Sequence, residues 1–136
     1  MELDKSVSVA FAGMSAQSQR LKVIAENIAN ADSTGKTPDQ DPYKRKIISF
    51  ADELDKKLGV DMVKVTGVSQ VQGGFGWIYE PGNPAADASG YVKTPNVNTI
   101  TEMMDMREAQ RAYDADLNVI DAAKAMLSRT IDLLRG

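Results

Sequence analysis

The fold is decided by residues 3–31, which read LDKSVSVAFAGMSAQSQRLKVIAENIANA. Taken from Leu3 in alternating steps of four and three, eight of nine positions are apolar, and Gln17 is the exception. Charged and small polar residues fill most positions between them. This spacing predicts an amphipathic helix with a coiled-coil seam. We expect Asn30 or Asp32 to help end the helix, because short polar side chains compete for backbone hydrogen bonds.

The last third of the chain repeats this pattern, with eight apolar residues among ten seam positions from Met103 to Leu134. Pro95 discourages an earlier helix start, and Thr99 and Glu102 have the spacing of a capping box. We therefore expect a second long helix from about Thr99 to Arg135. The seam residues expected to mediate assembly are Leu3, Val7, Met14, Leu21, Ile24, Ile28, Met103, Met106, Tyr113, Leu117, Ile120, Leu127, Ile131 and Leu134.

The middle of the chain has a different character. Residues 32–42 are turn and loop formers, and short strands are expected within 43–50, 63–66 and 75–79, with a tight turn at Gly73-Gly74. The predicted fold is mainly α with a small β-rich insertion, in which the N- and C-terminal helices pair as an elongated, coiled-coil-like core. The expected domains are a discontinuous helical domain, residues 1–32 plus 98–136, and an outer loop and β-rich segment, residues 33–97.

A pair of helices leaves little interior for a stable globule of its own. Both helices also carry small residues away from the seam, among them Ala12, Gly13 and Ala16 in the first, and Ala109 and Ala112 in the second. Small residues let neighbouring helices approach closely, so we interpret the pair as packing on other subunits. The pattern predicts an assembly protein.

Composition excludes several kinds of chemistry. The 136 residues include no His and no Cys, and 16 Lys and Arg against 19 Asp and Glu leave a net charge of −3. The commonest general base, the thiolate nucleophile and the usual zinc ligands are therefore all missing. We predict no catalytic, cofactor-binding or metal-binding residue. Tyr43-Lys44-Arg45-Lys46 is the one basic cluster, and in an acidic chain it favours a solvated strand edge over a nucleic-acid site.

Two kinds of targeting segment, a cleavable secretory signal and a membrane span, are not indicated by the sequence. No stretch of about 20 apolar residues could span a bilayer, and the mixed charge of the first residues is unlike a cleavable secretory signal. Signal-peptide export is not indicated.

Two segments resemble a known family. The end of the first helix, from Ala25 to Asp32, resembles the signature of bacterial flagellar axial proteins, the rod, hook and hook-associated subunits. Its core is Asn27, Ile28, Ala29 and Asn30. The stretches 79–87 and 90–98 are similar to the proximal rod group of that family. The residues that carry this more specific likeness are Tyr79, Glu80, Pro81, Gly82, Asn83, Pro84, Pro95 and Asn96.

This resemblance implies a structural rod subunit of the flagellar basal body that transmits torque for motility. It implies packing of the terminal helices with copies of the chain and with other rod subunits, namely FlgB, FlgF, FlgG and FliE. It also implies type III export without a cleaved signal peptide and a place in the rod across the periplasm. No cofactor, nucleic acid or membrane span is implied.

Two other functions share some of these features. A soluble coiled-coil adaptor or chaperone, acting as a discrete dimer, would share the heptads but gives no reason for residues 79–98. A small enzyme using carboxylates would need a concave pocket, which nothing in the sequence predicts.

Overall fold

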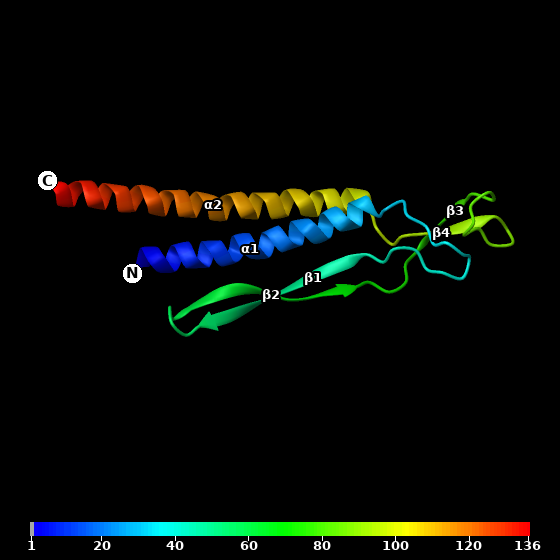
Figure 1. Ribbon diagram of the computed structural model, residues 1–136, viewed down its shortest axis with the longest axis horizontal. Coiled ribbons are helices and arrows are strands. Elements are labelled where there is room, and N and C mark those ends of the chain that lie inside the picture. Colours follow the sequence, from blue (N-terminus) through cyan, green and yellow to red (C-terminus); the bar gives the residue numbers. More distant parts are fainter. Residues whose placement is uncertain (1) are drawn as a thin grey trace. The chain divides into compact units, whose positions relative to one another are not determined.

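The computed structural model describes residues 2–136 and contains two long helices and two small sheets (Figure 1). Helix α1 spans Glu2–Ala29 and α2 spans Thr99–Arg135. Strands β1 (Lys46–Asp55) and β2 (Val60–Gln70) form one sheet, and β3 (Gly76–Tyr79) and β4 (Tyr91–Thr94) form the other. The predicted class, two terminal helices with a small β-rich insertion, is confirmed. Coiled-coil-like pairing stays a prediction. Neither described helix has an apolar stretch sufficient to cross a membrane.

The chain divides into two compact units, and each terminal helix contributes to both. The helix-pair unit comprises residues up to Leu21, Ser49–Gly67 and Arg107–Gly136. The junction unit comprises Lys22–Ile48 and Val68–Met106, so it holds the end of α1 and the start of α2. The predicted separation of residues 1–32 plus 98–136 from residues 33–97 stays a prediction.

In the helix-pair unit the two helices run antiparallel. Arg20 Nη2 lies 3.6 Å from Glu108 Oε2, and Gly13 faces Asp116 further along. A Cβ on Gly13 would lie 2.3 Å from Asp116 Oδ2, so the glycine is what lets this carboxylate reach the α1 backbone. Small side chains dominate the rest of the contact. The buried apolar residues of this unit are Ala10, Ala16, Ala109, Ile120 and Ala123.

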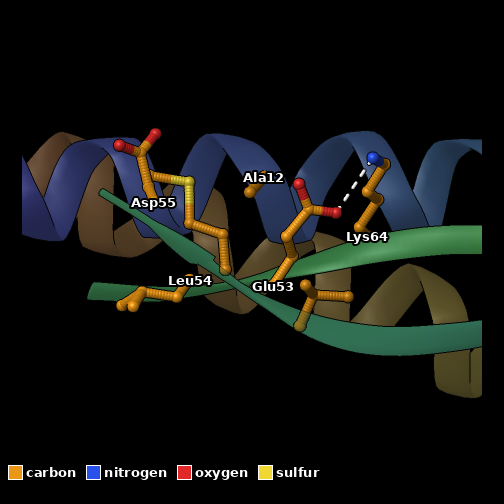
Figure 2. A pocket seen from close by; sticks show the side chains of 7 residues that line it. Ala12, Glu53, Leu54, Asp55 and Lys64 are labelled. Atoms are coloured by element: carbon orange, nitrogen blue, oxygen red, sulfur yellow. Dashed lines mark ion pairs between the residues drawn. The ribbon is translucent and has the colours of Figure 1, made fainter. Parts of the chain in front are cut away.

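The outer part of the β1–β2 hairpin belongs to the same unit. Its turn ends at Gly59, whose φ of 67° is one that glycine adopts without strain, and the Gly59 N–H donates to the Asp55 carbonyl at 2.7 Å. Figure 2 shows the hairpin beside Ala12 of α1, with Glu53 and Lys64 paired across the strands at 2.9 Å. The small Ala12 side chain leaves an open hollow of about 270 Å³ between helix and hairpin.

In the junction unit, β3 and β4 pair antiparallel, with Trp77 opposite Lys93 and Tyr79 opposite Tyr91. The rings of Tyr79 and Tyr91 meet edge to face at 5.4 Å. Between the strands, the loop 80–90 is closed by its own hydrogen bonds, including Glu80 N–H to the Gly90 carbonyl at 3.0 Å. The segment that carries the proximal-rod likeness is therefore a hydrogen-bonded hairpin, in which Val92 is fully buried.

Candidate functional site

The signature motif ends α1 at a buried polar cluster, which we call the Asn27 node: Asn27, Tyr43, Arg45, Lys46 and Glu102. All five belong to the junction unit. Asn27 and Glu102 are each 1% exposed, so their polar atoms depend on protein partners. The node joins the last turn of α1, the residues that lead into β1, and the first turn of α2.

The Asn27 carboxamide is fully hydrogen-bonded. Nδ2 donates to the Lys46 carbonyl at 2.9 Å and to Glu102 Oε2 at 3.3 Å. Oδ1 accepts from the Lys46 N–H at 2.9 Å and from the Tyr43 hydroxyl at 2.8 Å. Asn27 thus binds both backbone groups of one residue, as a neighbouring strand would, and fixes the start of β1 to the end of α1.

Glu102 does not act as the sequence predicted. The predicted capping box with Thr99 is wrong: Asn98 caps α2, because its Oδ1 accepts the N–H groups of Ile100 and Thr101 at 3.1 and 3.3 Å. The Glu102 carboxylate instead turns into the node, where Oε1 accepts from Arg45 Nε. Arg45 Nη2 also lies 3.6 Å from Asp105 Oδ2, one turn further along α2.

The basic cluster 43–46 is half-buried and engaged in specific contacts, which corrects the expectation of a solvated strand edge. Besides the contacts of Arg45, Lys46 Nζ pairs with Glu26 Oε2 at 3.1 Å. Burial raises the pKa of Tyr43, outweighing the opposing charge of Lys46. The hydroxyl is protonated at neutral pH even without this shift, and it donates to Asn27 Oδ1.

Asn96, two residues after β4, connects the node to the segment between β2 and β3. Its Oδ1 accepts the Arg45 N–H at 2.7 Å, and its Nδ2 donates to the carbonyls of Val71 and Gly73 at 2.9 and 2.8 Å. Of the other predicted motif residues, Asn30 follows the last residue of α1 and donates from Nδ2 to the Glu26 carbonyl at 2.8 Å. That Asn30 or Asp32 helps end the helix stays a prediction. Ile28 is half-buried, and Ala29 is exposed.

The predicted seam divides between buried and exposed positions. Ile24 and Ile120 are buried, and Leu3, Val7, Met14, Leu21, Ile28, Met106 and Tyr113 are half-buried. The larger apolar side chains of α2 lie largely on its free surface, with Leu134 83% exposed. The seam residues exposed in the single chain are Met103, Leu117, Leu127, Ile131 and Leu134.

Comparison with known proteins shows the family. A flagella basal body rod protein profile matches residues 8–35, and the C-terminal profile of the flagellar basal body rod FlgEFG proteins matches residues 88–133. The flagellar basal-body rod protein FlgC of Agrobacterium fabrum is 51% identical over 134 residues, 98% of this chain and 96% of the relative. The chain belongs to the FlgC family. FlgC of Salmonella typhimurium is 42% identical over 134 residues, covering 98% of each chain. FlgC of Borreliella burgdorferi is 38% identical over 154 aligned positions, covering both chains fully.

The two profile matches contain the ends of the FlgC-family chain but not its middle. Asn27, Asn96 and Glu102 lie within them, whereas Tyr43, Arg45 and Lys46 fall between them. Sequence reasoning identified Asn27 and Asn96 from the resemblance and missed the roles of Tyr43, Arg45 and Glu102. A basic cluster in an acidic chain was the one available signal for Arg45, and it did not name the buried partner.

No group of three or more acidic side chains among residues 2–136 is arranged to hold a metal ion. The chemistry available to this FlgC-family chain at the node is hydrogen bonding and ion pairing, both of which fix geometry. The arrangement suits a structural role, and the family is one of structural rod proteins.

Proposed function

We propose that this chain, a structural subunit of the flagellar basal-body rod, joins the rod through its terminal helices and transmits torque along it. The observation that carries this proposal is the exposed apolar surface of α2. Leu127, Ile131 and Leu134 are all exposed, and they are seam positions rather than scattered single residues. Exposed apolar rows of this kind mark protein–protein contacts.

The C-terminal end of α2 supports this proposal most directly. In the helix-pair unit, Leu3 near the start of α1 lines one groove together with Ala123 and Leu127. Because the helices are antiparallel, residues 128–135 continue beyond the start of α1. Leu133 and Leu134 there are the most exposed large apolar residues of the described chain. Neighbouring subunits in a rod would cover this end.

The node would serve the same function from the other end of the helices. We infer that Asn27 fixes how the chain leaves the helical core, so that torque on the helices reaches the β-rich segment. The partners we propose are copies of the chain, FlgB and FliE on the membrane side, and FlgF or FlgG on the distal side. We further propose type III export without signal cleavage, a location in the rod across the periplasm, and no catalytic activity.

The leading alternative, a coiled-coil adaptor or chaperone dimer, is not favoured by the full-length FlgC relatives. Sedimentation of the purified chain distinguishes the two. An adaptor would sediment as a compact dimer, whereas a rod subunit is expected to be monomeric until it meets its partners.

The decisive experiment uses Leu134→Asp, with Ser128→Asp as the matched control on the same exposed end of α2. A carboxylate at an interface that becomes dry costs several kcal/mol, whereas at an exposed position it costs little. We expect both purified variants to keep the helix content of the unmodified chain. Leu134→Asp should be lost from isolated basal bodies and abolish swimming, and Ser128→Asp should not. Normal rods with Leu134→Asp would show that this surface is not an interface.

A further inference from the structure

We propose that Arg45 and Glu102, neither of them in the signature motif, are the positioning pair of this rod subunit. They orient the Asn27 carboxamide and tie the segment that leads into β1 to the start of α2. The inference rests on the proposed function as a rod subunit and names the residues through which the junction unit serves it.

Glu102 divides its two carboxylate oxygens between two elements. Oε1 accepts from Arg45, and Oε2 accepts from Asn27 at 3.3 Å. At 1% exposure the carboxylate has almost no access to water, so these protein donors satisfy it. Through this one side chain, α2 holds both the end of α1 and the residue just before β1.

The orientation of Asn27 is determined by its surroundings. The amide nitrogen and oxygen of an asparagine have nearly the same shape, so its hydrogen-bond partners decide which one points where. A flipped carboxamide would place Oδ1 against the Glu102 carboxylate and the Lys46 carbonyl. It would also place Nδ2 against the Lys46 N–H. The Glu102 carboxylate therefore acts together with the Lys46 carbonyl and N–H to select the one orientation in which Asn27 binds the Lys46 backbone.

Arg45 completes the connection with its backbone and its side chain. Its N–H donates to Asn96 Oδ1 at 2.7 Å, while its guanidinium meets Glu102 and lies 3.6 Å from Asp105 Oδ2. A guanidinium has several N–H donors and can pair with two carboxylates one helical turn apart, whereas the single ammonium of lysine pairs with both less well. Arg45 thus fixes the direction in which the chain enters β1.

The test uses the full-length chain with Glu102→Gln, Arg45→Gln and Arg45→Lys. Matched controls are Glu108→Gln, an exposed carboxylate on α2 paired with Arg20, and Lys44→Gln, a cation adjacent to Arg45. Two quantities are measured for each variant. One is hydrogen exchange of the Lys46 amide, relative to amides of the β3–β4 hairpin in the same unit. The other is the amount of the chain in isolated basal bodies when the variant is the sole copy.

Glu102→Gln keeps the size of the side chain but removes the negative charge that reinforces the Asn27 orientation. We expect the Lys46 amide to exchange at least about tenfold faster, the equivalent of one lost hydrogen bond, while the β3–β4 amides are unchanged. Incorporation into basal bodies should fall at least about tenfold. Arg45→Gln should behave in the same way, Arg45→Lys should be intermediate, and both controls should match the unmodified chain.

Each failure has a distinct meaning. Loss of Lys46 protection with normal incorporation would make the pair a purely structural contact and overturn the positioning role. Unchanged Lys46 exchange in both Gln variants would overturn the selection of the Asn27 orientation. If Glu102→Gln fails to fold, Arg45→Lys decides: wild-type exchange and incorporation would refute the pair. The proposed function is tested separately: normal rods containing Leu134→Asp would refute assembly through the exposed surface of α2.

Discussion

Each of the two units is stabilised internally by a different kind of contact. In the junction unit, Asn27, Glu102 and Asn96 make directional hydrogen bonds to backbone and side chains over sequence separations of up to 75 residues. In the helix-pair unit, the contact between helices consists mainly of alanine side chains and the close approach at Gly13. Large apolar side chains such as Leu127 and Leu134 are left outside it.

This difference indicates a division of roles. Hydrogen bonds to backbone specify one geometry and leave little to be supplied by a partner. Alanine contacts bury little apolar area, so a helix pair built from them gains much of its stability only when neighbours cover the remaining surface. The junction unit is therefore expected to be well ordered in the single chain, and the helix-pair unit to gain most on assembly.

The largest effect is expected from breaking the node at Asn27. Asn27→Ala removes four hydrogen bonds and leaves the Lys46 backbone, the Tyr43 hydroxyl and Glu102 without this partner. Buried groups left unpaired cost about 1–3 kcal/mol each, so we expect a loss of about 4 kcal/mol in the free energy of unfolding. Asn30→Ala, which removes one bond to the Glu26 carbonyl, should cost about 1 kcal/mol. Urea denaturation of both variants measures the difference; equal losses would contradict the central place of Asn27.

The next effect contrasts buried and exposed positions of the helix-pair unit. Ile120 is 5% exposed and Leu127 is 52% exposed. Ile120→Ala should lower the free energy of unfolding of the single chain by about 2–3 kcal/mol, and Leu127→Ala by less than about 1 kcal/mol. Leu127→Ala should nevertheless reduce incorporation into the rod more than Ile120→Ala does, although its effect on the stability of the single chain is smaller. Denaturation of the monomer and quantification of basal bodies, taken together, test whether the exposed seam is an interface.

The sequence predicted the helices better than the node. Heptad spacing depends on local periodicity, so it located both helices, and α1 ends at Ala29, within two residues of the last seam position. Pro95 and the spacing of Thr99 and Glu102 placed the start of α2 correctly at Thr99, although the capping box itself is wrong. The node depends on contacts between Asn27, Arg45 and Glu102, which are far apart in the chain, and no local pattern encodes such pairing. Glu102 illustrates this limit, because three residues after Thr99 it has the spacing of a capping glutamate, and only the fold shows that Asn98 caps instead.

A smaller effect is expected in the loop that carries the proximal-rod likeness. Gly90 has a φ of 86°, and a Cβ there would lie 2.8 Å from Tyr79 Cε2 and 3.2 Å from Pro81 Cβ. Gly90→Ala should therefore cost about 1–2 kcal/mol, from backbone strain and displacement of the Tyr79 ring. Gly82→Ala, in the same loop with open space around it, should cost less than about 0.5 kcal/mol. Thermal unfolding compares the two. A tolerated Gly90→Ala would mean that the loop is less rigidly specified than the node.

The smallest effect on stability is expected from the Asp116 carboxylate, which lies between the two helices. Burial raises the pKa of Asp116, the residue that Gly13 admits to the α1 backbone, and Glu2 and Lys5 line the same hollow. Because the folded chain holds this proton more tightly than the unfolded chain, the contribution of Asp116 to stability is greatest below the ordinary pKa of 3.8. It then falls as the pH rises through the raised value. Asp116→Asn removes that dependence and should be more stable at neutral pH by less than about 1 kcal/mol, since the side chain is only partly buried.

The matched control is Asp114→Asn, an exposed carboxylate on the same helix. Unfolding midpoints measured from pH 3 to pH 7 should converge at the acid end for Asp116→Asn and the unmodified chain, and separate toward neutral pH. Asp114→Asn should follow the unmodified chain throughout. If Asp116→Asn is instead less stable at neutral pH, the carboxylate contributes a favourable contact at Gly13. The helix-pair unit would then depend on a specific polar interaction, as the junction unit does. The contrast between alanine packing in one unit and directional hydrogen bonds in the other would be correspondingly weaker.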